Sequence, residues 1–389
     1  MQKILDLSIG DMAGISFDCE CGQHHQVDIK QILVGSGVFP QIVQIIKEHH
    51  WKHVCLIADA NTCRVAGGRA ESLLKDAGIP VHTVLFPEKE RLTPDEAALG
   101  HIVAELCPED DLLLAVGSGT INDLTRLVSF RTKIPYVIAA TAPSMDGFAS
   151  TVSPLILKGE KVTLPGVYPA AIIADTSIMK DAPMEMLTAG FGDIIGKFTS
   201  NADWRLSHIL NGEQYCGVCA ELVAQAVQKC ADNGAKLKER DEDAVKYVTE
   251  ALVLSGIAMG LYKDSRPASG AEHHFSHYWE VDALEKGEEH SLHGNSVSVG
   301  AVVSASLYEL ARDYLPKDFE APDKEHILSV IADAGAPMSP LDIGISKELF
   351  HRSILHAMDI RERFTILRFC ENRNLLRTFA DILTDRYYK

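Results

Sequence analysis

The chain has 389 residues, 46% of them hydrophobic and 23% charged, which is typical of a globular protein with enough material for two domains. Its net charge of −17 argues against a nucleic-acid partner or an anionic membrane surface. Nine scattered cysteines do not suggest a disulfide framework. Residues 1–14 lack a signal-peptide core, and no apolar run approaches the roughly 18 residues of a membrane span, so we expect a cytoplasmic protein without membrane insertion.

Residues 1–28 predict a short N-terminal strand or hairpin. This segment contains Cys19 and Cys21, with His24 and His25 close behind. A small zinc site is one interpretation. The Cys-x-Cys spacing differs from the usual zinc-ribbon knuckle, however, so the sequence favours a β-hairpin with incidental thiols.

From about residue 30, predicted strands and helices alternate. The helix at 61–78 is expected to begin at Asn61 as its cap and to stop at Gly78, and the helix at 93–107 to begin at Thr93 with Glu96 closing a capping box. Such alternation indicates a Rossmann-like parallel sheet covered on both faces. The expected strands are 31–35, 53–59, 81–87, 111–116, 134–140 and 168–175.

The pattern changes near residue 176, beyond which almost every segment has helical periodicity. We therefore predict an α/β nucleotide-binding domain at 1–175 and an all-α domain at 176–389, with a ligand in the cleft between them. Cys216 and Cys219 fall in the first turns of a predicted helix. Without a second pair nearby they are interpreted as small buried hydrophobic residues.

Two loops at predicted strand ends are candidates for ligand binding. GSGTIND (117–123) opens a helix, and its glycines let the backbone approach an anion at the helix N-terminus. It is not a complete Gly-x-Gly-x-x-Gly fingerprint, because position 122 is Asn, and a plain tight turn is the alternative. TAPSMDGFAS (141–150) follows the next strand, at the edge where open α/β sheets bind ligands, although a polar turn explains it equally well.

Histidines concentrate in residues 271–300. His273 and His277 are four residues apart and share one face of a helix, and His293 follows about twenty residues later. A divalent metal held by imidazoles usually has an anionic ligand too, and Asp193 lies within a mostly apolar stretch. A solvated helix face is the alternative. His274 points elsewhere on such a helix.

These features together resemble the superfamily of iron-containing alcohol dehydrogenases, glycerol dehydrogenase and dehydroquinate synthase. Within it, the resemblance is closest to the AraM-type sn-glycerol-1-phosphate dehydrogenases of bacteria, and it spans essentially the whole chain. It implies the dehydroquinate synthase-like fold, with the active site between the two domains. The motifs that carry it are GSGTIND, TAPSMDGFAS, GFGDIIGKFTSNADW, SGAEHHFSH and LHGNSVSVG.

The resemblance implies roles for particular residues. Asp193, His273 and His293 correspond to catalytic metal ligands, and His277 to a catalytic histidine that contacts the substrate, as Asp193 also does. Asp146 corresponds to a contact with a substrate hydroxyl. Asp59 corresponds to the group that reads the adenosine ribose, which favours NAD over NADP. The other implied cofactor contacts are Gly117, Ser118, Gly119, Thr120, Ile121, Thr141, Ala142, Pro143, Ser144 and Ser150, although the superfamily often has glycine where Ser118 stands.

The implied reaction is reversible NAD(P)H reduction of dihydroxyacetone phosphate to sn-glycerol 1-phosphate, for glycerophospholipid synthesis. The implied partners are one divalent metal, with nickel slightly favoured over zinc, a phosphorylated triose and a second subunit in a homodimer. The phosphate needs donors, and the candidates near the motifs are Lys158, Lys161, Lys197, Arg205 and Arg266.

Other functions remain open at this stage. One is a glycerol or other alcohol dehydrogenase with the same metal and cofactor. Another is a catalytically silent NAD-binding regulatory protein, against which the intact ligand set argues. Dehydroquinate synthase fits less well, because that family places Glu where Asp193 stands.

Overall fold

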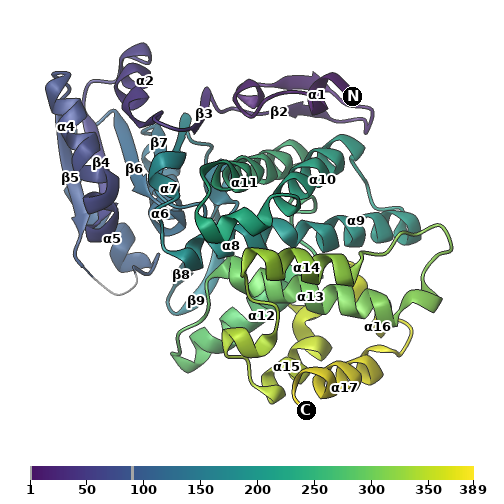
Figure 1. The fold of residues 1–389 in the computed structure, drawn as a ribbon. Coiled ribbons are helices and arrows are strands. Elements are labelled where there is room, and N and C mark those ends of the chain that lie inside the picture. Colours follow the sequence, from purple (N-terminus) through teal and green to yellow (C-terminus); the bar gives the residue numbers. More distant parts are fainter. Residues whose placement is uncertain (1, 89–91) are drawn as a thin grey trace.

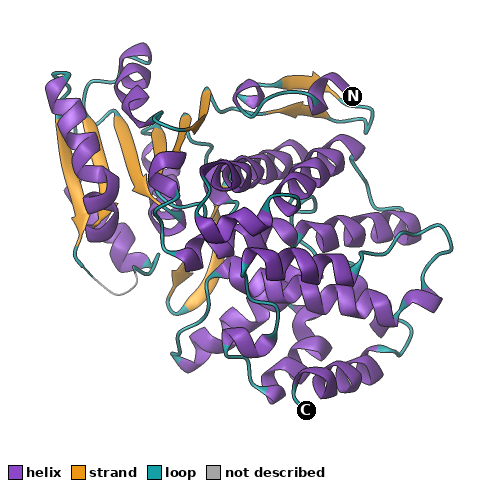
Figure 2. Cartoon of the chain, in the orientation of Figure 1, coloured by secondary structure: helices purple, strands orange, loops and turns teal. Residues whose placement is uncertain are grey.

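The computed structural model of the chain describes residues 2–88 and 92–389. A parallel sheet with its helices forms one side of the molecule, and a larger body of helices forms the other (Figures 1 and 2). This arrangement confirms the predicted fold class.

The sheet has six strands in the order β3-β10-β7-β6-β4-β5, and neighbouring strands are parallel. Alternate residues of one strand belong to different hydrophobic clusters: Leu113 lies in one cluster, and Leu112 and Leu114 in another. Both faces are therefore covered, which is why the central strands are continuous apolar runs. The strands are β3 (Gln31–Gly35), β4 (Val54–Asp59), β5 (Val81–Phe86), β6 (Leu112–Gly117), β7 (Tyr136–Ala140) and β10 (Ala171–Asp175).

The caps of two helices beside the sheet differ from prediction. Asp59, not Asn61, caps the first: its Oδ1 accepts hydrogen bonds from the backbone N–H groups of Asn61 and Thr62, at 2.8 and 2.9 Å. Asp95, not Thr93, caps the second, where its carboxylate accepts from the Ala98 N–H at 2.8 Å. In both cases the negative charge of the carboxylate also interacts favourably with the positive end of the helix dipole, which Asn and Thr do not provide. The helices among residues 2–179 are α1 (Gln2–Leu5), α2 (Ile42–Glu48), α3 (Ala60–Thr62), α4 (Gly68–Asp76), α5 (Glu96–Glu105), α6 (Gly119–Thr132) and α7 (Thr176–Met179). Of these, α1 lies with the N-terminal hairpin beside the helical half (Figure 1).

Two antiparallel hairpins accompany the sheet. The first, β1 (Ser16–Asp18) with β2 (His24–Gln26), was predicted in outline and lies beside the helical half (Figure 1). The second, β8 (Val152–Leu157) with β9 (Glu160–Pro165), was not predicted. Its two-residue turn has positive φ at Lys158 and Gly159, 55° and 80°, the conformation that a tight hairpin requires. A Lys-Gly pair is a weaker signal of that turn than Asn-Gly.

The helical half begins where the sheet ends. The last strand stops at Asp175, and the regular elements described after it are helices. The division into domains 1–175 and 176–389 stays our proposal. The helices are α8 (Met184–Ile195), α9 (Lys197–Asn211), α10 (Gly217–Ala231), α11 (Glu242–Tyr262), α12 (Ala271–Lys286), α13 (His293–Leu310), α14 (Lys324–Ala334), α15 (Lys347–His356), α16 (Ile366–Glu371) and α17 (Leu376–Tyr387).

Helix α11 bears on the expectation that the chain contains no membrane-spanning segment. Among the residues described, it alone is long and apolar enough to cross a bilayer by length and composition. In this structure 67% of its most apolar window is buried inside the protein, as in a core helix.

Helices α8 and α13 approach at backbone distance. A Cβ added to Gly192 would lie 2.5 Å from the carbonyl oxygen of Gly294 and 2.7 Å from Cβ of Ser298, so a side chain does not fit there. Gly192 precedes Asp193 and Gly294 follows His293. The close packing of the two helices thus brings these two polar residues together.

A buried carboxylate on α9 connects several other helices. Asp203 is fully buried, and it accepts hydrogen bonds from the Tyr308 hydroxyl and from the backbone N–H groups of Ala271 and Ile366, each at 2.7 Å. Burial raises its pKa to about 6. Asp203 therefore fixes the start of α12, the histidine-bearing helix.

We expect Asp203→Ala to lower the free energy of unfolding by about 3–5 kcal/mol, because three buried donors lose their acceptor. Tyr308→Phe removes one of these hydrogen bonds and should lower it by about 1 kcal/mol. Urea denaturation of both variants measures the difference. Equal losses in the two variants would contradict the central role of the carboxylate.

Candidate metal and nucleotide site

Asp193, His273 and His293 lie together although they come from three helices. Each offers one ligand atom, and the three atoms lie within 4.8 Å of one another. The Nε2 atom of His273 is 3.6 Å from Oδ1 of Asp193, and the ring centroids of His273 and His293 are 5.1 Å apart. Two imidazoles and one carboxylate are a suitable donor set for a divalent transition metal. His274 follows His273 on α12, but it is buried and does not belong to this group.

Neighbouring side chains orient both imidazoles. Nδ1 of His273 donates a hydrogen bond to Oε1 of the buried Glu272 at 2.8 Å, which leaves Nε2 directed at Asp193. Nδ1 of His293 lies 3.2 Å from the Ser276 hydroxyl. A carboxylate behind a metal-binding histidine fixes the tautomer and increases the basicity of the ligand. Glu272 was missed by sequence reasoning, and its position next to His273 is the one signal that pointed to it.

Asp193 belongs to a buried charge network. Its Oδ1 lies 2.6 Å from Nζ of Lys197, its Oδ2 accepts from the Asp146 N–H at 3.0 Å, and Lys197 also lies 3.0 Å from Oδ2 of Asp146. Burial, followed by the charge of Asp146, raises the pKa of Asp193 to about 6 although Lys197 opposes this shift. Burial disfavours the ammonium of Lys197, but the two carboxylates outweigh it and raise its pKa.

The three clustered histidines are held neutral. Burial is the main cause, and nearby lysines add to it: the pKa of His293 is lowered to about 4, that of His277 to about 3, and that of His273 well below its usual value. Neutral imidazoles have a free lone pair, which metal binding requires.

His277 faces the cluster from one helical turn further along α12. Its ring centroid is 5.3 Å from that of His293, and its Nδ1 lies 3.0 Å from Nζ of Lys161 on β9. Glu280 pairs with Lys161 and lies 3.8 Å from Nδ1 of His277. Glu280 was also missed. Its spacing of three residues from His277 places the two on one helix face and was the available signal.

Asp59 and the loop at 117–121 lie at adjoining strand ends. β4 and β6 are neighbours in the sheet. The chain continues from β4 to β5 on one side of this pair, and from β6 to β7 and β10 on the other side, so the direction of the strand order reverses between β4 and β6. Such a switch point is where open α/β sheets bind dinucleotides. Gly117 ends β6, and a Cβ there would lie 2.7 Å from Cβ of Ile121. Helix α6 begins with Gly119 and Thr120. The first N–H groups of this helix have no intrahelical partners.

The loop at 141–150 connects the glycine loop to the cluster of Asp193, His273 and His293. Its start is tied to the glycine loop, since the Thr141 N–H donates to the Gly117 carbonyl at 3.0 Å and the Ser118 and Ser144 hydroxyls are 2.6 Å apart. Ala142 and Pro143, between Thr141 and Ser144, are buried.

At the end of this loop, the Ser150 hydroxyl donates a hydrogen bond to the Val152 carbonyl at 3.2 Å, so this hydroxyl already has a partner within its own turn.

The candidate phosphate donors separate into two groups. In the first group, Lys161 contacts His277 and Lys197 contacts Asp193. Lys158 is exposed at the β8–β9 turn, Arg205 pairs with Glu320 at 3.5 Å, and Arg266 is buried against Glu213 and the Phe364 carbonyl.

A family model and a solved structure both identify the fold class of this chain. Residues 33–183 match the model described as iron-containing alcohol dehydrogenase. The solved iron-containing alcohol dehydrogenase of Thermococcus thioreducens has a TM-score of 0.69 to this structure at 15% identity, and the alignment covers 92% of this chain and 98% of that one. The fold is therefore that of the iron-containing alcohol dehydrogenases.

Two relatives narrow the assignment. The glycerol-1-phosphate dehydrogenase (NAD(P)+) of Halalkalibacterium halodurans is 34% identical, over 93% of this chain and 97% of its own length. The enzyme of the same name from Bacillus subtilis is 35% identical, over 90% of this chain and 93% of its own length. The chain belongs to the glycerol-1-phosphate dehydrogenase family.

We expect Glu272→Ala to weaken divalent metal binding by about 10–100-fold, because His273 loses the acceptor that orients it. Thr199→Val is the matched control. The Thr199 hydroxyl donates to the other oxygen of Glu272 at 2.7 Å and does not touch His273. Competition with a chromophoric chelator measures both affinities. An unchanged affinity in Glu272→Ala would show that this contact does not support metal binding.

Proposed function

We propose that this chain reversibly reduces dihydroxyacetone phosphate with NAD(P)H to sn-glycerol 1-phosphate, the backbone of a glycerophospholipid. Family membership supports the reaction. The structural observation that carries the proposal is the cluster of Asp193, His273 and His293 beside a loop that begins at the nucleotide edge of the sheet.

The proposed metal ligands are Asp193, His273 and His293. A divalent metal bound there supplies a Lewis acid for the substrate carbonyl and stabilises the negative charge that develops on its oxygen. The donor set suits nickel, zinc, iron or cobalt, and the resemblance slightly favours nickel.

Asp146 and His277 are proposed to handle the substrate hydroxyl and its proton. Asp146 is held by Lys197 and by the Ser255 hydroxyl at 2.9 Å, both through Oδ2, so it presents an oriented carboxylate to a hydroxyl. An ammonium group only donates, so Nδ1 of His277 accepts from Lys161 and Nε2 carries the ring proton. His277 can therefore donate a hydrogen bond or a proton from Nε2 to the substrate.

Lys161 is proposed as the phosphate donor. Lys197 is fully buried between two carboxylates, whereas Lys161 keeps 16% of its side chain exposed and reaches the cluster from the β8–β9 hairpin. A phosphate replaces the carboxylate of Glu280 as the partner of this ammonium.

Asp59 is proposed to read the adenosine ribose, and the glycine loop to hold the pyrophosphate. The carboxylate accepts from a 2′-hydroxyl and repels a 2′-phosphate, which favours NAD. The family resemblance supports a homodimer, and a cytoplasmic location completes the proposal.

The first test measures NADH oxidation with dihydroxyacetone phosphate after chelator treatment, with Ni²⁺, Zn²⁺, Fe²⁺ or Mg²⁺ added back singly. We expect one transition metal to restore activity, and His273→Ala to lower kcat/KM at least about 1,000-fold. Unphosphorylated dihydroxyacetone is the control substrate and should be the poorer one. Full activity in the stripped protein would exclude the metal mechanism.

Asp59→Asn should raise the ratio of kcat/KM for NADPH to that for NADH by about 10-fold, because it removes roughly 1.4 kcal/mol of charge repulsion. The amide oxygen of Asn still accepts from the N–H groups of Asn61 and Thr62, so the helix cap is preserved. Asp59→Ala removes both functions and should also lower the melting temperature. A ratio unchanged in both variants would argue against the ribose contact.

Lys161→Gln should raise KM for dihydroxyacetone phosphate by about 10–100-fold, the range expected for a lost hydrogen bond to a charged group. KM for dihydroxyacetone should change less, because with this substrate only the contact of Lys161 with His277 is lost. Lys158→Gln, at the exposed turn of the same hairpin, is the matched control. Equal KM values in the two variants would refute the assignment.

A further inference from the structure

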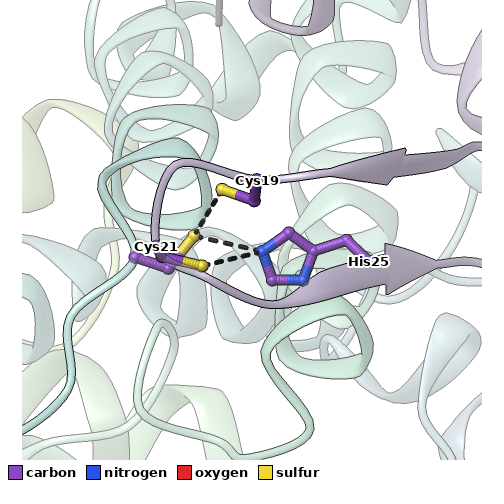
Figure 3. A group of neighbouring side chains, drawn as sticks. Cys19, Cys21 and His25 are labelled. Carbon is purple, nitrogen blue, oxygen red and sulfur yellow. Dashed lines mark hydrogen bonds between the residues drawn. The ribbon is translucent and has the colours of Figure 1, made fainter.

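A second group of metal-ligating side chains lies away from the catalytic cluster. Cys19 and Cys21 follow β1, His25 lies in β2, and Cys216 is the residue before α10. Their four ligand atoms lie within 4.8 Å of one another. In Figure 3 the side chains of Cys19, Cys21 and His25 point toward one another from the hairpin.

Three of the spacings within this group match those of a tetrahedral zinc centre. Bonds of about 2.3 Å to sulfur and about 2.0–2.1 Å to nitrogen, at tetrahedral angles, separate two sulfurs by about 3.8 Å and a sulfur from a nitrogen by about 3.6 Å. The Sγ atoms of Cys19 and Cys216 are 3.7 Å apart. The Sγ atoms of Cys21 and Cys216 are each 3.4 Å from Nε2 of His25. A disulfide needs about 2.05 Å, far less than the Cys19–Cys216 distance.

The imidazole of His25 is already fixed for coordination. It is fully buried, and its Nδ1 lies 2.6 Å from the carbonyl oxygen of Leu261, at the end of α11. A carbonyl only accepts, so Nδ1 carries the proton and Nε2 presents its lone pair to the three sulfurs. A backbone carbonyl in this position is a common second-shell partner of a metal-binding histidine.

The turn between the strands places the two hairpin cysteines. The Gly22 N–H donates to the Cys19 carbonyl at 2.9 Å, the Cys19 N–H donates to the Gln23 carbonyl at 3.0 Å, and Gly22 has a φ of 83°. The turn is held against the helical half as well, since Nε2 of Gln23 donates to Oε1 of Gln214 at 3.0 Å. The cysteines therefore face Cys216 without rearrangement of the backbone.

We propose that Cys19, Cys21, His25 and Cys216 bind one zinc ion as a closed, structural site. Three soft thiolates and one imidazole select zinc over the harder divalent ions, and four protein ligands leave no open position for a substrate. The hairpin consists of two three-residue strands and is marginal by itself. The ion joins it to the start of α10 through Cys216, and His25 contacts the end of α11.

This assignment revises two interpretations from the sequence. The hairpin is present as predicted, but its thiols are not incidental, and Cys216 is more than a small buried residue. The sequence hid the site because its fourth ligand is 191 residues from His25. Cys219, the other cysteine of the pair, is outside the four-residue group.

Cobalt substitution tests the proposal independently of the catalytic site. The full-length, metal-free protein is titrated with Co²⁺ under reducing conditions and followed by absorption. We expect the near-ultraviolet sulfur-to-cobalt charge transfer of a thiolate site, with a stoichiometry of about one per chain. Asp193, His273 and His293 contain no sulfur, so the His273→Ala variant should give the same band even where activity is lost.

Variants locate the ion. Cys216→Ser should weaken the cobalt affinity of this site by more than about 100-fold, since loss of a ligand exceeds the effect of a second-shell change. Cys63→Ser, a partly buried cysteine outside the group, should leave the band unchanged. Zinc should displace cobalt and raise the melting temperature of the wild-type chain.

Three results would overturn the proposal. The first is a wild-type chain saturated with Co²⁺ that shows no charge-transfer band. The second is an unchanged band in Cys216→Ser. The third is a Cys19–Cys216 disulfide that persists in protein purified with a reductant, which would identify a covalent pair instead of a metal site.

Discussion

The burial of Asp193 is the constraint on which the centre of the molecule depends. An ionised carboxylate without water is costly unless charges and hydrogen bonds surround it. Lys197 supplies the charge, and the backbone of Asp146 supplies a hydrogen bond from the loop that follows β7. This second contact crosses from the sheet half to the helical half. The requirement to compensate one charge therefore fixes how the two halves meet.

Glycines make this arrangement sterically possible. The backbone contact between α8 and α13 at Gly192 and Gly294 lets Asp193 and His293 face the same point, and α12 joins them because Asp203 holds its first residue. Three helices are thus positioned by interactions outside the cluster. The arrangement of Asp193, His273 and His293 therefore follows from the packing of these helices and not from the three side chains alone.

The sequence predicted the parts of this structure that depend on local periodicity. The continuous apolar runs predicted a buried parallel sheet, and the histidine spacing predicted that His273 and His277 share a helix face. Features that depend on long-range contacts were missed. The convergence of Cys216 on the N-terminal hairpin does not follow from spacing, since it depends on tertiary packing. Glu272 was missed although it is adjacent to His273, because neighbouring residues of a helix do not usually face each other. The two helix caps were predicted wrongly for a different reason: the cap rules favour several neighbouring residues, and the charge of Asp59 and Asp95 adds a favourable interaction with the helix dipole. The roles of the site residues stay predictions.

The ion pair between Lys161 and Glu280 has a consequence for selectivity. On the proposed assignment, Glu280 is an internal competitor that occupies the ammonium whenever substrate is absent. A ligand must displace a carboxylate that is only 15% exposed, and a neutral ketose has no charge with which to do so. A doubly charged phosphate does. The ion pair thus selects ligands by their charge at the binding step, before the reaction. This selection depends on the short β8–β9 hairpin, because the hairpin carries Lys161.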